Sequence, residues 1–129
     1  MADKEVKGDD SNFHYIPNEK LNWNDAKERC ANMGMELARF SSELEYEAGV
    51  NYITNMGSTN DVWVGVSSDG TTPYEYKWTD GEPTFWFTWI IGEPNSQESE
   101  QCVRIKRNNN YGYATRQCSF EFDYLCSCK

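Results

Sequence analysis

Residues 78–103 hold five acidic side chains and no lysine or arginine. The five acids are Asp80, Glu82, Glu93, Glu98 and Glu100. Carboxylates crowded on one loop repel one another unless water or a shared cation offsets their charge. Glu93, Asn95 and Glu100 offer the hard oxygen ligands that calcium binds, and Ca²⁺ takes roughly 6–8 of them. The segment is therefore either a calcium site or a solvated acidic loop.

The overall charge argues against several classes of partner. The 129 residues include 12 Lys+Arg and 21 Asp+Glu, so the formal net charge is −9. Nucleic acids and anionic membranes bind concentrated cations, and the sequence has no block of them, so we expect neither as a partner. The longest apolar run is well short of the ~20 residues that a membrane-spanning helix needs, which argues against membrane insertion.

The sequence also argues against catalysis. His14 is the single histidine, which argues against His-based triads and His-rich zinc sites. Glu93 and Glu100 could be imagined as the carboxylate pair of a glycosidase. An acid and a base in such a pair need different surroundings, however, and the loop that carries both looks uniformly solvated. We therefore expect a non-enzymatic protein.

The five cysteines predict an oxidising environment. They include no CxxC pair, so a zinc site is not indicated, and four of them are expected to form structural disulfides. This density is typical of secreted, extracellular proteins. The first residues are polar and lack a signal peptide, which a mature or recombinant form explains; a cytosolic protein is the alternative. Residues 1–12 are predicted to be a flexible leader and residues 13–129 a single domain.

Two helices are predicted in the first half of the chain. Asn22 is a good N-cap with Asp25 three residues on, followed by periodic apolar residues. Ser42 and Glu45 resemble the capping box of a second helix. The apolar face of this second helix is expected at four-residue steps, at Leu44, Ala48, Tyr52 and Met56.

The second half indicates strands around a long loop. Together with a short strand between the helices, strands are predicted at residues 36–40, 62–66, 74–78, 102–106 and 120–126. Between Asp80 and Cys102, glycines and prolines interrupt any regular pattern, and a loop of this length in a compact domain is usually functional. The fold class is therefore α+β, with two helices followed by a β-rich half and an extended loop.

Motifs spread along the chain resemble those of the C-type lectin-like domain. In chain order they are Leu21-Asn22-Trp23, Met35-Glu36-Leu37-Ala38, Trp63-Val64-Gly65-Val66, Tyr76-Lys77-Trp78, Trp89-Ile90-Ile91-Gly92, Glu93-Pro94-Asn95, Glu100-Gln101-Cys102-Val103 and the Cys118…Cys126 spacing. The resemblance covers Phe13 to Cys126. It implies small antiparallel sheets, a long irregular loop, and the disulfides Cys30–Cys126 and Cys102–Cys118.

Cys128 is left over from these two pairs. It lies two residues from Cys126 in a predicted strand, so both side chains point to one face and could compete for Cys30. The family spacing favours Cys126 as the partner of Cys30. Cys128 is then either a frayed terminal thiol or the bridge of a homodimer.

The resemblance implies that the loop binds sugars through one calcium ion. Family members use a Glu-x-Asn pair that ligates the metal and hydrogen-bonds two vicinal sugar hydroxyls. Glu93-Pro94-Asn95 is similar to the mannose-type version, which selects mannose, glucose, N-acetylglucosamine or fucose, and Glu100 matches a third ligand. The resemblance therefore implies a secreted mannose-type lectin whose partners are glycans or glycoproteins.

One part of the family pattern is missing. The second ligand cluster, Trp-Asn-Asp, falls on Tyr113-Ala114-Thr115, where Ala114 has no ligand to offer. Thr115 is expected to substitute as a metal and sugar ligand, with residues 108–110 as further substitutes. Losing a carboxylate and an amide weakens Ca²⁺ binding, because affinity follows ligand charge and number. The alternative function is a calcium-independent domain that binds a protein, or a glycan by aromatic stacking.

Aromatic side chains near the loop could serve that alternative. They are Phe85, Phe87, Tyr111 and Tyr113, whereas Trp86 falls at a position that is usually packed in the family. Exposed aromatic rings stack on sugars and anchor protein partners, whereas packing inside the loop's own core is the competing interpretation. Tyr113 therefore joins the expected carbohydrate-binding residues, which are Glu93, Asn95, Glu100, Thr115 and Tyr113.

Overall fold

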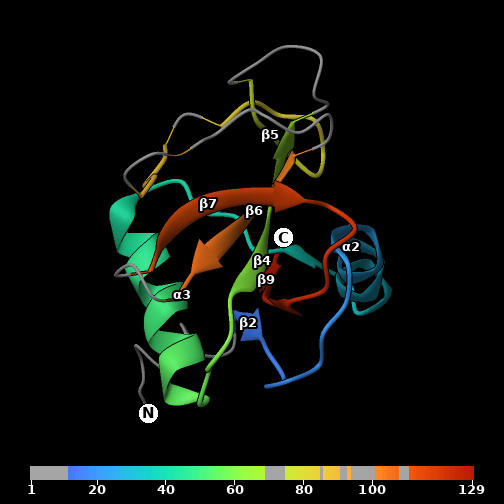
Figure 1. The fold of residues 1–129 in the computed structure, drawn as a ribbon, viewed down its shortest axis with the longest axis vertical. Helices are drawn as coiled ribbons and strands as arrows, with labels where there is room; N and C mark the ends of the chain where they lie inside the picture. Colours follow the sequence, from blue (N-terminus) through green and yellow to red (C-terminus); the bar gives the residue numbers. More distant parts are fainter. Residues whose placement is uncertain (1–11, 69–74, 85, 91–92, 94–100, 108–110) are drawn as a thin grey trace.

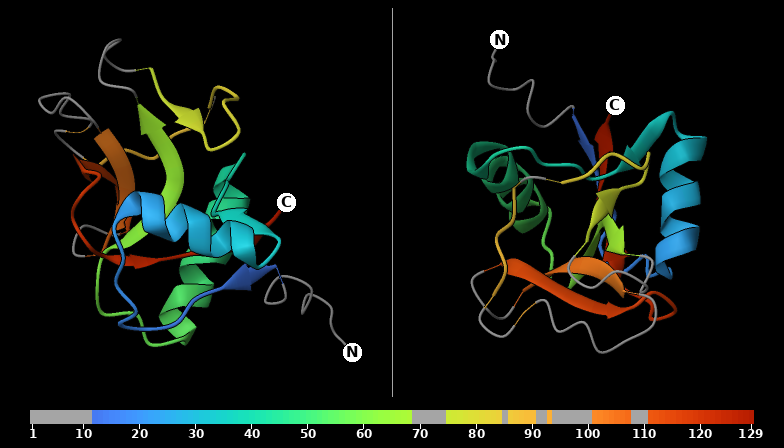
Figure 2. Two further views of the ribbon diagram at one scale, coloured as in Figure 1. Left: turned by 90° about the vertical axis from the view of Figure 1, so that its right-hand side faces the viewer. Right: turned by 90° about the horizontal axis from the view of Figure 1, so that it is seen from above.

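Two helices lie on opposite sides of two small β-sheets (Figure 1, Figure 2). The computed structural model describes residues 12–68, 75–84, 86–90, 93, 101–107 and 111–129. Helix α2 spans Trp23–Asn32 and helix α3 spans Glu43–Asn55. The α+β fold class predicted from the sequence is confirmed.

Side-chain caps fix the start of both helices. The Oδ1 atom of Asn22 accepts a hydrogen bond from the Asp25 N–H at 2.8 Å. The hydroxyl of Ser42 accepts one from the Glu45 N–H at 3.3 Å. Each cap satisfies a backbone donor that the first turn leaves without a helical partner. Both predicted helix starts are therefore confirmed.

The buried face of α3 is only partly the one predicted: Ala48 and Tyr52 are half-buried, and Tyr52 packs against the main core. Leu44 and Met56 are 78% and 42% exposed. The buried residues of this helix are instead Tyr46, Gly49 and Ile53. A Cβ atom at Gly49 would lie 2.8 Å from the ring of Phe40, so the glycine lets this ring approach the helix. The prediction was wrong for Leu44 and Met56, because four-residue spacing does not indicate where the Phe40 ring packs against the helix.

The strands form one sheet of three and one of five. The smaller sheet has the order β2-β9-β3, with strands Phe13–His14, Cys126–Cys128 and Met35–Leu37. The larger sheet has the order β5-β4-β6-β7, with strands Lys77–Trp78, Val62–Ser68, Gln101–Lys106 and Gly112–Gln117. Strand β8, Asp123–Tyr124, runs parallel to β4, and the other pairings among these strands are antiparallel.

Several features of this arrangement differ from the sequence prediction. Strands β2 and β7 were not predicted, and the strand expected at residues 120–126 is divided between the two sheets. The division falls at Leu125, whose N–H donates to the Trp63 carbonyl at 3.2 Å and whose carbonyl accepts from the Ala38 N–H at 2.8 Å. The chain therefore passes from one sheet to the other at this residue.

Two disulfides join these elements. Cys30–Cys126 links α2 to β9, and Cys102–Cys118 links β6 to the turn after β7. This is the pairing that the family resemblance implied. Cys128 is exposed and lies outside both disulfides, so Cys126 and not Cys128 is the partner of Cys30.

The chain ends of the described structure meet in the smaller sheet. Residues 1–11 of the expected leader lie outside the described residues. Asn12 is described, and its carbonyl accepts a hydrogen bond from the Cys128 N–H at 2.9 Å. No helix in the part of the chain that the structure describes has the length and apolar character needed to cross a membrane.

Candidate functional site at the loop edge of strand β7

Strand β7 positions the long loop. One edge of β7 pairs with β6, with Ile105 opposite Tyr113. Along the other edge, the Tyr113 N–H donates to the Thr88 carbonyl at 2.8 Å, and the Ile90 N–H donates to the Tyr113 carbonyl at 3.1 Å. These backbone bonds lay the loop along β7, and we call this side the loop edge of β7.

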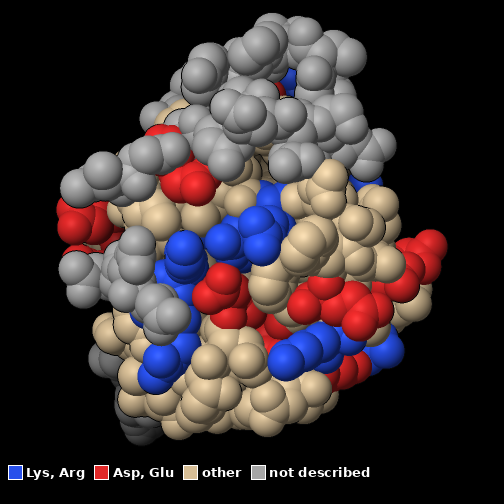
Figure 3. All heavy atoms as spheres, viewed as in Figure 1, with Lys and Arg blue, Asp and Glu red and all other residues tan. Residues whose placement is uncertain are grey.

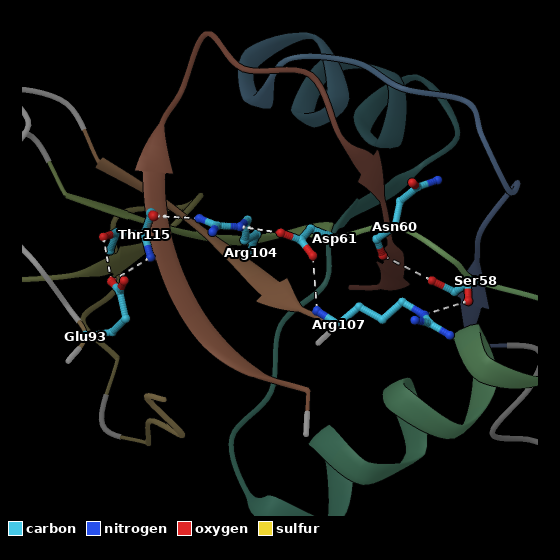
Figure 4. Close-up of polar contacts among 7 residues, drawn as sticks. All are labelled: Ser58, Asn60, Asp61, Glu93, Arg104, Arg107 and Thr115. Carbon is cyan, nitrogen blue, oxygen red and sulfur yellow. Dashed lines mark hydrogen bonds and ion pairs between the residues drawn. The ribbon is translucent and has the colours of Figure 1, made fainter. Parts of the chain in front are cut away.

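At the loop edge, Thr115 holds the carboxylate of Glu93. The Thr115 N–H and hydroxyl both donate to the Oε1 atom of Glu93, at 3.0 and 2.9 Å (Figure 4). The structure thus brings two predicted site residues together. The groups that were expected to bind a ligand bond to each other. The remaining predicted ligands, Asn95 and Glu100, lie outside the described residues, as do residues 108–110.

Arg104, on the neighbouring strand β6, completes the site. Its Nη1 atom donates to the Thr115 carbonyl at 2.6 Å, and its Nε atom donates to the Oδ2 atom of Asp61 at 2.7 Å. The Oδ1 atom of Asp61 accepts from the Arg107 N–H at 3.1 Å, and the Arg107 side chain reaches the Ser58 carbonyl at 3.2 Å. A continuous polar chain therefore runs from the loop to the end of α3 (Figure 4).

Sequence reasoning missed Arg104 and Asp61. The available signal is the position of Arg104 as a lone cation between Val103 and Ile105, two apolar residues of a strand. Alternation places Arg104 on the face away from the core, yet it is only 6% exposed. A cation buried to this degree needs paired partners, and Asp61 and the Thr115 carbonyl supply them.

The described residues do not fit a calcium ion at the loop edge. Ala114 offers no side-chain ligand, and the carbonyl that Thr115 would offer already accepts from Arg104, while its hydroxyl donates its hydrogen to Glu93. A guanidinium bonded to the Thr115 carbonyl also repels a metal ion that approaches the same oxygen. No cluster of three or more His, Cys, Asp or Glu residues placed to hold a metal occurs among the described residues.

Other acids of the segment are offset by the chain itself. The Arg39 guanidinium lies 2.8 Å from the Oδ2 atom of Asp80 and 3.7 Å from the Oε1 atom of Glu82. The Glu82 N–H and the Arg39 guanidinium hold the pKa of the Asp80 carboxyl below its ordinary value. Two of the five loop acids therefore need no bound cation to offset their charge.

Tyr113 does not present its ring to a ligand. It is fully buried and packs edge-on against Tyr46, Trp86 and Trp89, with ring centroids 5.5, 6.1 and 5.8 Å away. Burial raises the pKa of its hydroxyl well above the ordinary value. The prediction that Tyr113 contacts a sugar is wrong, because alternation along β7 turns its side chain toward the core.

The aromatic residues of the loop also pack inward. Trp86, Phe87 and Trp89 are half-buried against the main core, and Phe87 stacks on Trp89 with centroids 5.3 Å apart. Tyr111 packs on the same core, and Phe85 lies outside the described residues. Core packing is thus the interpretation that the described rings support.

Tyr113→Phe is expected to stabilise the fold by about 1 kcal/mol, because the buried hydroxyl of Tyr113 has no hydrogen-bond partner among the described residues. Urea unfolding monitored by fluorescence measures this free energy. Tyr76→Phe is the control, since the Tyr76 hydroxyl donates to Gln101 Oε1 at 2.9 Å and its removal should destabilise by a similar amount. A loss of stability in Tyr113→Phe equal to that in Tyr76→Phe would contradict the assignment.

Comparison with known proteins identifies the class. Residues 19–128 match the model of the Lectin C-type domain. A C-type lectin mannose-binding isoform of Oxyuranus scutellatus is 29% identical over 117 residues, which are 87% of this chain and 73% of that protein. The C-type mannose receptor 2 of Homo sapiens is 25% identical over 93% of this chain, which spans only 8% of the receptor.

A solved structure shows the same architecture. A calcium-independent type II antifreeze protein has a TM-score of 0.72 and 25% identity, over 88% of this chain and 82% of that one. With the family match over residues 19–128, the chain belongs to the C-type lectin domain family. This family is in general non-enzymatic.

Proposed function

We propose that this domain binds glycans, free or on glycoproteins, at the loop edge of β7. The single observation that carries the proposal is the Glu93 carboxylate, fixed there by two donors of Thr115 at 3.0 and 2.9 Å. A carboxylate held in place before the ligand arrives loses little conformational freedom on binding. Its oxygens accept about four hydrogen bonds in total, which suits the hydroxyl groups of a saccharide.

The sequence around Glu93 supports a mannose-type ligand. Glu93-Pro94-Asn95 resembles the mannose-type motif, and one relative is named as a mannose-binding isoform. We include Asn95 and Glu100 in the proposed site, together with Glu93 and Thr115. Calcium dependence is the family's usual mode, but the fit of the described residues favours recognition by hydrogen bonds without the metal.

Glu93→Gln is expected to weaken binding to a mannose-bearing surface about tenfold or more. The substitution keeps the shape of the side chain and removes its charge, and hydrogen bonds to charged groups contribute about 1.5–3 kcal/mol against about 0.5–1.5 for neutral ones. Surface plasmon resonance on immobilised mannan, run in calcium and in EDTA, measures the effect. Glu47→Gln, at an exposed position of α3, is the matched control.

The outcomes separate the candidate functions. Binding that persists in EDTA and falls in Glu93→Gln supports the proposal. Binding that EDTA abolishes assigns the calcium-dependent mannose-type lectin. No binding to mannan or to a glycan array in either buffer overturns glycan recognition and leaves the second candidate, a protein-binding domain, which the incomplete ligand set at Ala114 favours.

The proposal extends to the boundaries of the domain, its compartment and its oligomeric state. We place the binding domain at residues 13–129, behind a leader of residues 1–12, in an extracellular protein that acts by binding. Its two disulfides suit that compartment. A homodimer bridged through the exposed Cys128 would raise avidity for clustered glycans. Migration at monomer mass on a non-reducing gel would exclude this dimer.

A further inference from the structure

The outward face of the β6–β7 hairpin carries three cations. The register pairs Cys102 with Arg116, Arg104 with Ala114 and Lys106 with Gly112. Alternation puts these six residues on one face, because Val103, Ile105 and Tyr113 on the other face belong to the main core. Lys and Arg side chains gather over this part of the molecule (Figure 3), in a chain whose net charge is −9.

Arg104 reaches the backbone of β7 beside the loop edge. The Tyr113 N–H and carbonyl both bond to the loop, and the Thr115 N–H, two residues on, bonds to Glu93 of the same loop. The Arg104 guanidinium starts on β6 and bonds to the Thr115 carbonyl at 2.6 Å. The cross-strand partner of Arg104 on β7 is Ala114. Ala114 is 0% exposed although it lies on the outward face.

Asp61 and Phe122 fix the guanidinium in this path. Its Nε atom bonds to Asp61 at 2.7 Å, and its carbon lies 5.4 Å from the centroid of the Phe122 ring. The backbone of Thr115 then lies between opposite charges: its carbonyl accepts from the Arg104 cation, and its N–H donates to the Glu93 anion. Glu93 is thus oriented entirely by groups of this chain.

We infer that Arg104 takes the place of the metal ion at the loop edge of β7. Its guanidinium is a built-in cation that holds Thr115 and, through Thr115, positions Glu93. The small side chain of Ala114 leaves room for it. Arg104, Ala114 and Thr115 therefore depend on one another in positioning Glu93, and the site binds no Ca²⁺. This inference deepens the proposed glycan site and rests on it only for the role of Glu93 in recognition.

Calcium titration of the wild-type protein is the first test. After treatment with a chelator, the protein is titrated with CaCl₂ in a calorimeter, and its melting temperature is measured in CaCl₂, MgCl₂ and EDTA. We expect no binding heat and the same melting temperature in all three. A saturable, calcium-specific rise in melting temperature that Glu93→Gln abolishes would overturn the inference. Neither readout depends on a sugar, so the proposed function can fail while this inference stands.

Restoring the metal ligands is the second test. The double variant Ala114→Asn/Thr115→Asp keeps Arg104, and the triple variant adds Arg104→Thr. We expect the triple variant to bind calcium at least about tenfold more tightly than the double variant, because the guanidinium no longer competes for the site. Equal affinities, or no calcium binding by the triple variant, would contradict the role given to Arg104.

Glycan binding then tests the positioning role. Arg104→Thr in the otherwise wild-type chain should lose mannan affinity without gaining calcium binding, and Arg104→Lys should retain part of the affinity because it keeps the charge. Circular dichroism and melting curves verify that each variant is folded. Full mannan affinity in a folded Arg104→Thr variant would show that Arg104 does not position Glu93.

Discussion

Replacing Cys30 and Cys126 together with alanine is expected to lower the free energy of unfolding by about 4–5 kcal/mol. The bond closes a sequence separation of 96 residues, and restricting an unfolded loop of about 100 residues is worth about 4.7 kcal/mol in the chain-entropy model. Both sulfur atoms are also fully buried between α2 and the smaller sheet. Because domains are typically stable by about 5–15 kcal/mol, this variant should be close to unfolding at 37 °C.

The other disulfide is the matched comparison. Cys102 and Cys118 are 16 residues apart, so Cys102→Ala/Cys118→Ala should cost only about 3 kcal/mol by the same model. Urea unfolding of both double variants measures the difference, and the exposed Cys128 is present in each. A larger loss in the short-loop variant would mean that native packing, and not the length of the closed loop, decides the contribution of each bond.

The parts of the fold that the sequence predicts correctly depend on neighbouring residues. Asn22 and Ser42 cap helices through bonds to residues three positions on, so the capping motif and the bond it forms occupy the same few residues. The buried face of α3 could not be predicted in this way. It depends on the approach of Phe40 to Gly49, and these two residues meet only when the chain has folded.

Strand β7 was missed for a related reason. Its residues include Gly112, Ala114 and Arg116, which carry no β-strand preference of their own. The strand forms because one edge pairs with β6 over its full length and the other receives the loop. The strand is therefore fixed largely by neighbours that precede it in the chain, from Lys106 opposite Gly112 to Thr88 bonded to Tyr113.

The same distinction between local motifs and contacts made on folding applies to the residues of the candidate site. Glu93 and Thr115, which the structure brings into contact, each lie at a position that a motif singles out in the sequence. Arg104 was missed because its importance follows from the register that sets it opposite Ala114, and no spacing within one strand reveals a partner in another. Tyr113 was assigned wrongly because proximity to a motif in sequence does not tell which face of a strand a side chain takes.

Gly65→Ala is expected to lower the free energy of unfolding substantially, although less than loss of the Cys30–Cys126 disulfide. A Cβ atom at Gly65 would lie 2.6 Å from the Leu37 carbonyl oxygen and 3.1 Å from that of Ala38. Both are backbone atoms, and they cannot move aside as a flexible side chain can. We expect a loss of about 3 kcal/mol, at the upper end of the usual cost of overpacking, and a melting temperature lower by about 10 °C.

The backbone on both sides of this contact is held in place. The Gly65 N–H donates to the Ala38 carbonyl at 2.9 Å, and the Ala38 N–H donates to the Leu125 carbonyl at 2.8 Å. The Trp23 indole donates to the carbonyl of Val64, next to Gly65, at 2.8 Å. Moving β4 away from residues 37 and 38 would therefore break the hydrogen bonds that join the two sheets. The backbone cannot relieve the crowding at Gly65 without losing these bonds.

Gly49→Ala provides the control that separates backbone crowding from the loss of a glycine. The nearest atoms to its Cβ atom would be side-chain atoms, the Phe40 ring at 2.8 Å and Leu125 Cδ2 at 3.5 Å, and side chains can rotate or shift. Alanine also favours a helix over glycine by about 1 kcal/mol, so we expect Gly49→Ala to be much less destabilising than Gly65→Ala in thermal melts. Equal losses in the two variants would show that the 2.6 Å contact relaxes as readily as a side-chain contact, and that the two sheets can move apart at Gly65.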